Sequence, residues 1–480
     1  MDFRRKGVRL ILTALVLTIL LSVCSGCSAM ELLPLRWREA IAASDYEWAY
    51  LDAADAQQGV VITKYCGDST KIQIPGSIAD SPVVSIQGAF RDDGSECPFE
   101  NITEIHIPKS VTTIGDWAFS DCSGLTDIVL PEGVTEIGNW AFTGCSALSS
   151  ITLPEGITEI GNGAFSGCAA LTSITIPTSV DRIGEDAFLS CTGMKELTLS
   201  EGVSWIGNKA FYGCKNLTNV SIPDSVVRIG ENAFQGCTEL VSVTFPSRIT
   251  EISAGAFQGC TKLTGVVIPD SVNKIGAHAF EGCTGLTDIT IPASVEQMET
   301  SVFSGCTGLT DVTIAEGVTT ISVHIFADCT GLTSITLPDS VTVIDSGAFN
   351  GCTGLTSINI PDSVETIGIL AFGDCTLLDE ATKTRILQYN ADAFELLSKK
   401  KNIRLMQLDT SLEVNAKYKV TNVNDGLLVQ DIDDHKITAE DLRCVTNRKP
   451  TEEELEQLLF AWKVVKHVKS NAIVLVKDNM

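Results

Sequence analysis

The chain has 480 residues and a formal net charge of −26 at pH 7. So large an acidic excess argues against a nucleic-acid partner, because phosphate binding requires clustered lysine and arginine. The length exceeds what one compact core holds, unless the chain forms a repeat structure that grows along one axis. Residues 395–480 are neutral, with 14 residues of each sign, so the whole net charge lies in residues 1–394. This break predicts two segments of different origin.

The N-terminus has the pattern of an export signal. Basic residues precede an uncharged apolar run from Leu10 to Val23, which is too short to span a membrane comfortably. The run ends in Cys-Ser-Gly-Cys, which resembles a bacterial lipobox and makes residues 1–26 a signal peptide and Cys27 the lipidated first residue. An ordinary cleaved signal peptide is the alternative. In both cases the repeats are exported, and we expect them to be lipid-anchored to the bacterial cell envelope and exposed at the cell surface.

Residues 27–58 follow as an expected tether and N-terminal cap, because the terminal units of repeat proteins are atypical. A degenerate first unit comes next. Within it, Ser-Ile-Gln-Gly-Ala-Phe at residues 85–90 echoes a pattern that recurs throughout the following units.

A cysteine recurs every 23 residues from Cys122 to Cys375, and a phenylalanine stands three residues ahead of each. Such a register predicts a solenoid, in which each unit buries the face that its neighbour leaves exposed. Alternating isoleucines predict a half-buried strand, which a proline ends. A Val-x-x-Ile-Gly segment predicts a second short extended piece, whose glycine, such as Gly115 or Gly138, is expected to supply a backbone angle that other residues resist. An Ala-Phe-x-Gly-Cys turn then points Phe and Cys inward.

Units of the form Leu-Thr-x-Ile-x-Ile-Pro-x-x-Val-x-x-Ile-Gly-x-x-Ala-Phe-x-Gly-Cys closely resemble the BspA-like, or Treponema pallidum-type, leucine-rich repeat. The resemblance covers about residues 60–394 and implies a right-handed solenoid with one parallel sheet. The expected fold class is an α/β repeat, a leucine-rich-repeat solenoid with a parallel sheet over residues 59–375, followed by a small α/β fragment. Residues 376–394 are expected to form a C-terminal capping helix.

The resemblance also implies a function, because the family occurs in bacterial surface proteins that bind host or neighbouring-cell proteins. The chain is then a noncatalytic protein-binding or adhesion module, and its partner a host or bacterial surface protein or glycan. No nucleic acid, no cofactor and no membrane contact beyond the lipid anchor are expected. A structural envelope spacer is the alternative.

Residues 396–477, within a truncated tail segment that spans residues 395–480, resemble a piece of the bifunctional purine-biosynthesis enzyme that carries AICAR transformylase and IMP cyclohydrolase activities. The strongest run is Phe-Ala-Trp-Lys-Val-Val-Lys-His-Val-Lys-Ser-Asn-Ala-Ile-Val at residues 460–474. Asn471 in this run matches an active-site asparagine of that family. The family's catalytic Lys-His motif lies upstream of the part represented, so the tail is expected to be inert, with purine-pathway formyl transfer as the alternative function. The junction is either a true chimera or two reading frames joined by error.

The cysteine ladder allows two interpretations. Exported cysteines often pair, and neighbouring coils bring Cα atoms within disulfide range. Stacked side chains point in parallel, however, with Cβ atoms about 4.8 Å apart rather than the roughly 3.8 Å that a disulfide favours. One column of thiols also offers no tetrahedral ligand group, so no metal is expected. The prediction is free buried thiols that pack as small apolar residues.

Two surface features are candidate binding sites. Trp117 and Trp140 hold equivalent positions in successive units and should stack, either as a binding hot spot or as a shield for the end of the solenoid. The outward strand positions form a hydroxyl column, which is either a surface for a partner or the ordinary use of threonine in strands. The hydroxyl column comprises Thr152, Thr175, Thr198, Thr244, Thr290, Thr313 and Thr336, together with Ser221 and Asn359, and Val267 interrupts it.

Overall fold

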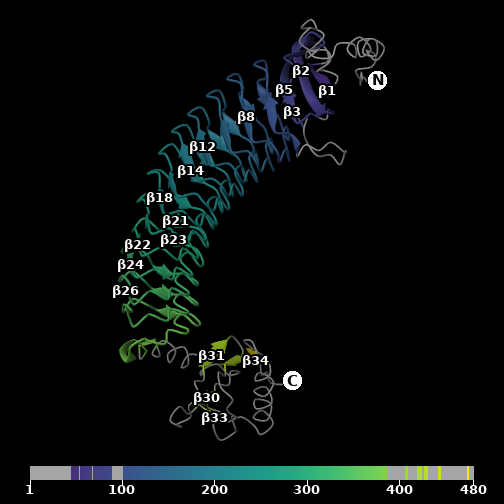
Figure 1. Ribbon diagram of the computed structural model, residues 1–480. Helices are drawn as coiled ribbons and strands as arrows, with labels where there is room; N and C mark the ends of the chain where they lie inside the picture. The colour runs from purple at the N-terminus through teal and green to yellow at the C-terminus, as the bar shows by residue number, and fades with distance from the viewer. Residues whose placement is uncertain are drawn as a thin grey trace.

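The computed structural model describes residues 45–52, 55–67, 69–88, 101–383 and 385–386, and the backbone of five short strands between residues 406 and 474. Successive coils stack into a curved solenoid (Figure 1). The expected leucine-rich-repeat solenoid with a parallel sheet is confirmed. Cys27 and Asn471 lie outside the described residues, and the proposed domain boundaries at residues 26, 58 and 394 stay predictions.

Each regular coil contributes one strand to a first parallel ladder, in which equivalent residues of neighbouring coils pair, as Ile151 does with Ile128. A buried residue lies between two exposed ones in these strands, because successive side chains point to opposite faces. The ladder has three hydrogen-bonded segments, β3 to β10, β12 to β24, and β26 with β28. Its strands are β3 (Lys71–Gln73), β6 (Glu104–His106), β8 (Asp127–Val129), β10 (Ser150–Thr152), β12 (Ser173–Ile176), β14 (Glu196–Leu199), β16 (Asn219–Ser221), β18 (Ser242–Thr244), β20 (Gly265–Val267), β22 (Asp288–Ile291), β24 (Asp311–Ile314), β26 (Ser334–Thr336) and β28 (Ser357–Asn359).

The Val-x-x-Ile-Gly segments form a second parallel ladder, where the family resemblance implied a single sheet. Its segments are β5 to β17, β19 to β23, and β25 to β29. The strands are β5 (Ser81–Ile86), β7 (Thr113–Ile114), β9 (Glu136–Ile137), β11 (Glu159–Ile160), β13 (Arg182–Ile183), β15 (Trp205–Ile206), β17 (Arg228–Ile229), β19 (Glu251–Ile252), β21 (Lys274–Ile275), β23 (Gln297–Met298), β25 (Thr320–Ile321), β27 (Val343–Ile344) and β29 (Thr366–Ile367).

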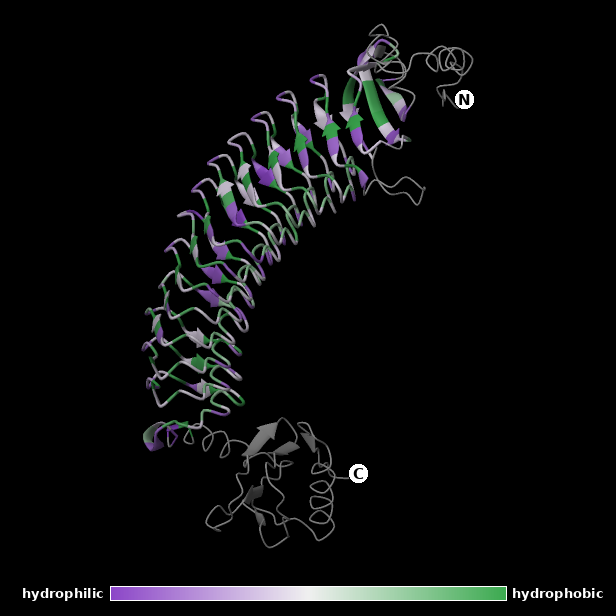
Figure 2. Cartoon of the chain, in the orientation of Figure 1, coloured by the Kyte–Doolittle hydropathy of each residue, from purple (hydrophilic) through white to green (hydrophobic). Residues whose placement is uncertain are grey.

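The third side of each coil is the Ala-Phe-x-Gly-Cys turn, and residues 102–378 contain no α-helix. The repeat is therefore built from strands and turns, without the helix that an α/β repeat implies. These turns also bond to one another, since the backbone N–H of Phe119 donates to the carbonyl of Ala141 at 2.7 Å. From Phe119 to Phe372 the inward phenylalanine rings stack with centroids 5.2–5.7 Å apart. Hydrophobic and hydrophilic residues alternate along each coil (Figure 2).

The glycine of the Val-x-x-Ile-Gly segment has a different role from the expected one. Neither Gly115 nor Gly138 has a positive φ, so neither supplies a left-handed angle. A Cβ at Gly138 would lie 2.6 Å from the backbone nitrogen of Asp116. Glycine fits at Gly138 because the backbone of the preceding coil lies so close to it, although Ser253, Glu299, Ser322 and Asp345 occupy the same position in other coils. The left-handed residues stand two positions later, at Trp117 and Trp140, with φ of 58° and 52°.

Both ends of the solenoid have distinct structures. At the N-terminal end, β1 (Tyr46–Asp52) pairs antiparallel with β2 (Asp55–Tyr65), which pairs parallel with β5, and β4 (Ser77–Ile78) pairs with β5. At the C-terminal end, residues 380–383 and 385–386 are helical, and Asp379 caps them by accepting the backbone N–H of Thr382 at 2.7 Å. This is where the expected capping helix begins.

The tail contributes five strands to the described structure. Their pairing is antiparallel, unlike that of the repeats. The strands are β30 (Met406–Leu408), which pairs with β33 (Leu442–Cys444), and β32 (Gly426–Gln430), which pairs with both β31 (Lys419–Val423) and β34 (Ile473–Val474).

Candidate functional site

The threonines of the hydroxyl column are exposed and occupy equivalent positions in the strands of the first ladder. Register pairs Thr175 with Thr198 and Thr290 with Thr313, and neighbouring strands lie about 4.8 Å apart. None of the seven threonine hydroxyls has a hydrogen bond to another described residue. The seven exposed threonines are Thr152, Thr175, Thr198, Thr244, Thr290, Thr313 and Thr336.

A second threonine column, three residues earlier in each unit, differs in its bonding. Thr126 Oγ1 donates to the carbonyl of Thr103 in the preceding coil at 3.3 Å, and Thr310 Oγ1 to that of Thr287 at 3.2 Å. These hydroxyls hold coils together. Strand propensity accounts for threonine in both columns, but only the hydroxyl column presents unused donors and acceptors to a ligand.

Trp117 and Trp140 stack as the sequence predicts, with ring centroids 4.7 Å apart and an interplanar angle of 15°. Trp140 is 38% exposed. Its ring lies over Gly163 of the next coil, where a Cβ would stand 2.4 Å from Cδ1 of the indole. Both tryptophans have positive φ, which costs a side chain roughly 1–2 kcal/mol. The pair is therefore kept at an energetic cost to the backbone.

Each of the twelve regular coils has one residue with positive φ at this position, and the sequence did not lead us to expect it. We call these residues the left-handed column. The available signal was the recurrence of Gly, Asn and Asp two residues after the Ile-Gly step, since these residues tolerate this conformation best. The column comprises Trp117, Trp140, Gly163, Asp186, Lys209, Asn232, Gly255, His278, Ser301, His324, Gly347 and Leu370.

Each ladder cysteine after the first donates its thiol hydrogen to a buried carbonyl of the preceding coil. Cys145 Sγ lies 3.1 Å from the carbonyl oxygen of Phe119, and the pattern continues to Cys375 and Phe349 at 3.0 Å. Burial raises the pKa of Cys214 to about 12, so the thiol stays protonated and unreactive. The ladder cysteines are free thiols in this structure. Cysteine fits the position because it is small, apolar and still carries a donor.

The second ladder breaks at two coils that carry serine in place of the Ile-Gly glycine. Ser253 marks the break between β17 and β19, and Ser322 the one between β23 and β25. Ser253 Oγ donates to the carbonyl of Ile229 at 2.5 Å, which a backbone N–H accomplishes in the glycine-containing coils. Glu299 occupies the same position without a break, because its backbone N–H still bonds the carbonyl of Ile275 at 2.9 Å. The serine hydroxyl therefore replaces the ladder bond.

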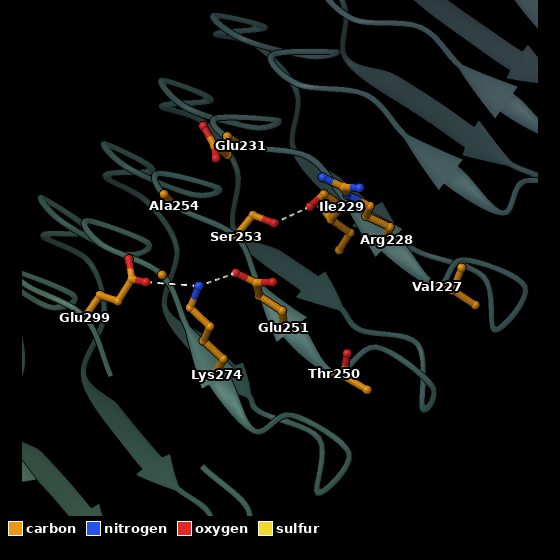
Figure 3. Close-up of a pocket in the computed structure, with 11 residues that line it drawn as sticks. Val227, Arg228, Ile229, Glu231, Thr250, Glu251, Ser253, Ala254, Lys274 and Glu299 are labelled. Carbon is orange, nitrogen blue, oxygen red and sulfur yellow. Dashed lines mark hydrogen bonds and ion pairs between the residues drawn. The ribbon is translucent and has the colours of Figure 1, made fainter. Parts of the chain in front are cut away.

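A groove of about 510 Å³ opens at the first break (Figure 3). Lys274 Nζ lies between Glu251 Oε1 and Glu299 Oε1, 3.0 Å from each. Glu299 Oε2 also accepts the backbone N–H of Ala277 at 3.0 Å. The hydrogen bonds from Lys274 and Ala277 lower the pKa of Glu299. Arg228 lines the same groove and makes no ion pair or hydrogen bond through its side chain with any residue that the structure describes.

The repeats match the family described as the BspA type leucine rich repeat region in three overlapping segments, residues 96–218, 204–333 and 321–432. Together these cover more than half of the chain. The chain belongs to the BspA-type leucine-rich repeat family. Among solved structures, this BspA-type chain resembles a leucine-rich repeat protein from Bacteroides ovatus, with 29% identity and a TM-score of 0.52 over 69% of this chain and 91% of that one. A leucine rich cell surface protein from Faecalibacterium prausnitzii is 30% identical, with a TM-score of 0.48 over 70% and 92%.

The tail of the BspA-type chain matches a second family, the AICARFT/IMPCHase bienzyme, over residues 386–480. It is 53% identical over 92 residues to the bifunctional purine biosynthesis protein PurH of Caldicellulosiruptor saccharolyticus, and 50% identical over 92 residues to that of Bacillus subtilis. The chain spans 18% of the length of each of these enzymes. The resemblance of the tail to a transformylase fragment is thereby confirmed.

Within the described ranges, no helix has the length and apolar character needed to cross a membrane. No group of three or more His, Cys, Asp or Glu side chains in those ranges is arranged to hold a metal ion. Of the site residues expected from sequence, the structure brings together the two tryptophans as one stack, and pairs Thr175 with Thr198 and Thr290 with Thr313. Cys27 and Asn471 stay predictions.

Proposed function

We propose that this BspA-type solenoid is a noncatalytic binding module that is exposed at the bacterial cell surface and adheres to a host or bacterial surface protein or glycan. One observation carries the proposal: the hydroxyl column is exposed, regularly spaced and unbonded, whereas the neighbouring threonine column is bonded to the backbone. The family and the export-type N-terminus support surface exposure, with Cys27 as the proposed lipid anchor. An extended solenoid surface suits a large partner.

Threonine-to-valine substitutions test this proposal, because valine keeps the shape and Val267 already holds one position of the column at 85% exposure. A variant with three such substitutions should bind bacterial cells or matrix-coated surfaces at least roughly tenfold more weakly than the wild type, since each lost hydrogen bond contributes about 0.5–1.5 kcal/mol. Its thermal stability should not change. The substitutions are Thr152→Val, Thr175→Val and Thr198→Val.

The matched control removes three bonded hydroxyls instead, and it should lose stability but keep binding. The control substitutions are Thr126→Val, Thr172→Val and Thr218→Val, whose hydroxyls donate to backbone carbonyls. If the first triple variant still binds and the double variant Trp117→Ala/Trp140→Ala does not, the binding site is the tryptophan stack rather than the hydroxyl column. A wild-type protein that binds neither surface would favour the envelope spacer.

Formyl transfer is the alternative function that the tail raises, and we propose that the tail does not perform it. The chain carries less than a fifth of the length of the PurH enzymes. The Lys-His motif on which that family's chemistry depends has no counterpart upstream of residue 396. An asparagine that contacts the transferred group, as the resemblance implies for Asn471, is insufficient by itself for catalysis.

A further inference from the structure

The groove at the first break of the second ladder has a chemistry that the hydroxyl column lacks. Its lining combines charged side chains with the hydroxyl of Thr250 and the small residues Ser253, Ala254 and Gly276. Its volume of about 510 Å³ falls within the roughly 300–1,000 Å³ typical of small-ligand sites. The groove can therefore hold a small polar group rather than an apolar one.

Arg228 is the cation that this groove offers to a ligand. Lys274 is already held by Glu251 and Glu299. Arg182, two coils earlier in the same column, lies 3.9 Å above the centroid of the Trp205 ring. The Arg228 side chain makes neither an ion pair nor a ring contact with any described residue. A guanidinium binds carboxylates and other planar anions through two parallel hydrogen bonds.

The neighbouring carboxylates restrict what else the ligand can carry. Glu251 uses Oε1 for Lys274, which leaves Oε2 as an acceptor, and the carboxylate of Glu231 makes no hydrogen bond or ion pair with a described residue. A ligand with several anionic groups would be repelled by these carboxylates. A ligand with one anionic group and several hydroxyls would satisfy Arg228 and the carboxylates together.

We propose that this groove binds a saccharide unit bearing one carboxylate. Arg228 pairs with the sugar carboxylate, and Glu231, Glu251 and Thr250 hydrogen-bond its hydroxyls. The groove is separate from the hydroxyl column, so this proposal does not depend on the proposed binding by that column. Figure 3 shows Arg228 on β17, with Glu251 on β19 and Lys274 on β21 on the other side of the break.

Ser253 gives the proposal a specific test, because it lines the groove and its hydroxyl takes the place of the ladder bond at this break. In Ser253→Gly the backbone N–H of residue 253 should bond to the carbonyl of Ile229, as Gly276 bonds to Ile252 at 2.8 Å, and the groove should close without loss of the fold. Ser322→Gly repairs the second break in the same way and serves as the matched control.

The experiment is a calorimetric titration of the full chain with a glucuronic-acid disaccharide and with its carboxyl-reduced counterpart. The wild type and Ser322→Gly should bind the acid at least about tenfold more tightly than the reduced sugar. Arg228→Gln and Ser253→Gly should lose that preference, and Arg182→Gln should retain it. The triple valine variant of the hydroxyl column should bind the acid unchanged, which separates this site from the adhesion surface.

Three results would overturn the proposal. The first is equal binding of the acid and the reduced sugar by the wild type. The second is binding that neither Arg228→Gln nor Ser253→Gly affects, with both variants shown to be folded by circular dichroism. The third is no binding of the disaccharide at about 10 mM, or tighter binding of a short acidic peptide than of the disaccharide.

Discussion

The left-handed column holds large side chains in a conformation that glycine adopts most easily. Only three of its twelve members are glycine, and two of those lie directly beneath a ring: Gly163 beneath Trp140, and Gly347 beneath His324. In these two places the ring of one coil occupies the space that a side chain of the next coil would need, whereas Trp117 is followed by Trp140 and stacks on it. This pairing across 23 residues is a constraint that no single unit reveals.

Lys209→Gly should stabilise the protein. Lys209 has a φ of 53° and is exposed, so the change relieves about 1–2 kcal/mol of left-handed strain and loses about 0.5–1 kcal/mol to glycine's chain entropy. We expect the free energy of unfolding in urea to rise by about 0.5–1 kcal/mol. Lys195→Gly, at an exposed position without positive φ, should lower it by a similar amount; a decrease in both variants would contradict the strain argument.

The cysteine ladder predicts loss of stability in alkali. Burial raises the pKa of the thiols of Cys168, Cys214 and Cys260 from 9.0 to about 12. Unfolded thiols ionise near pH 9 and native ones near pH 12. Their stabilisation is therefore complete below pH 9 and is lost as the pH rises from 9 towards 12, because the unfolded thiols ionise before the native ones.

Urea unfolding at about pH 8 and about pH 11 measures this loss. Cys214→Ser is the control, because its hydroxyl still donates to the carbonyl of Phe188 but does not titrate. The variant should show a smaller decrease in the free energy of unfolding between the two pH values than the wild type. Equal decreases would show that the thiol does not contribute.

The coils are joined along three lines: the first ladder, the second ladder and the bonds between turns. The first-ladder strands show the alternation expected from the sequence, with a buried residue between exposed ones, whereas a second-ladder strand such as β11 has only two residues, one exposed and one buried. The breaks at Ser253 and Ser322 are harder to predict, since Glu299 and Asp345 also replace glycine without breaking the ladder. Whether a substitution breaks the ladder depends on whether its side chain competes for the carbonyl of the preceding coil, as the hydroxyls of Ser253 and Ser322 do.

The capping helix should stabilise the last coil. Arg385 pairs with Asp362 of that coil at 2.6 Å, and Thr382 is buried. A chain ended after residue 378 should melt at a lower temperature than one ended after residue 390, because it exposes the core at Leu378 and loses this ion pair. The chain ended after residue 390 should melt like the full-length protein. Equal melting of both truncations would show that the helix is not a cap.

As a whole, the molecule joins a BspA-type solenoid to a fragment of a PurH-like enzyme. The net negative charge lies in residues 1–394, while the tail is neutral overall. A solenoid is stabilised by contacts between neighbouring coils, so its stability does not depend on the tail. Its displayed surface, rather than a central cavity, is where a partner would bind.

The coil follows from the amino-acid sequence alone: its length, its two strand segments, and the inward phenylalanine and cysteine. This is possible because a strict period allows one way of stacking. The folded arrangement of the coils was needed to learn which threonine column is unbonded, where the second ladder breaks, and how closely the coils approach at Gly138. These features depend on distances between residues 22 to 26 positions apart in neighbouring coils, and alternation within one unit carries no information about them.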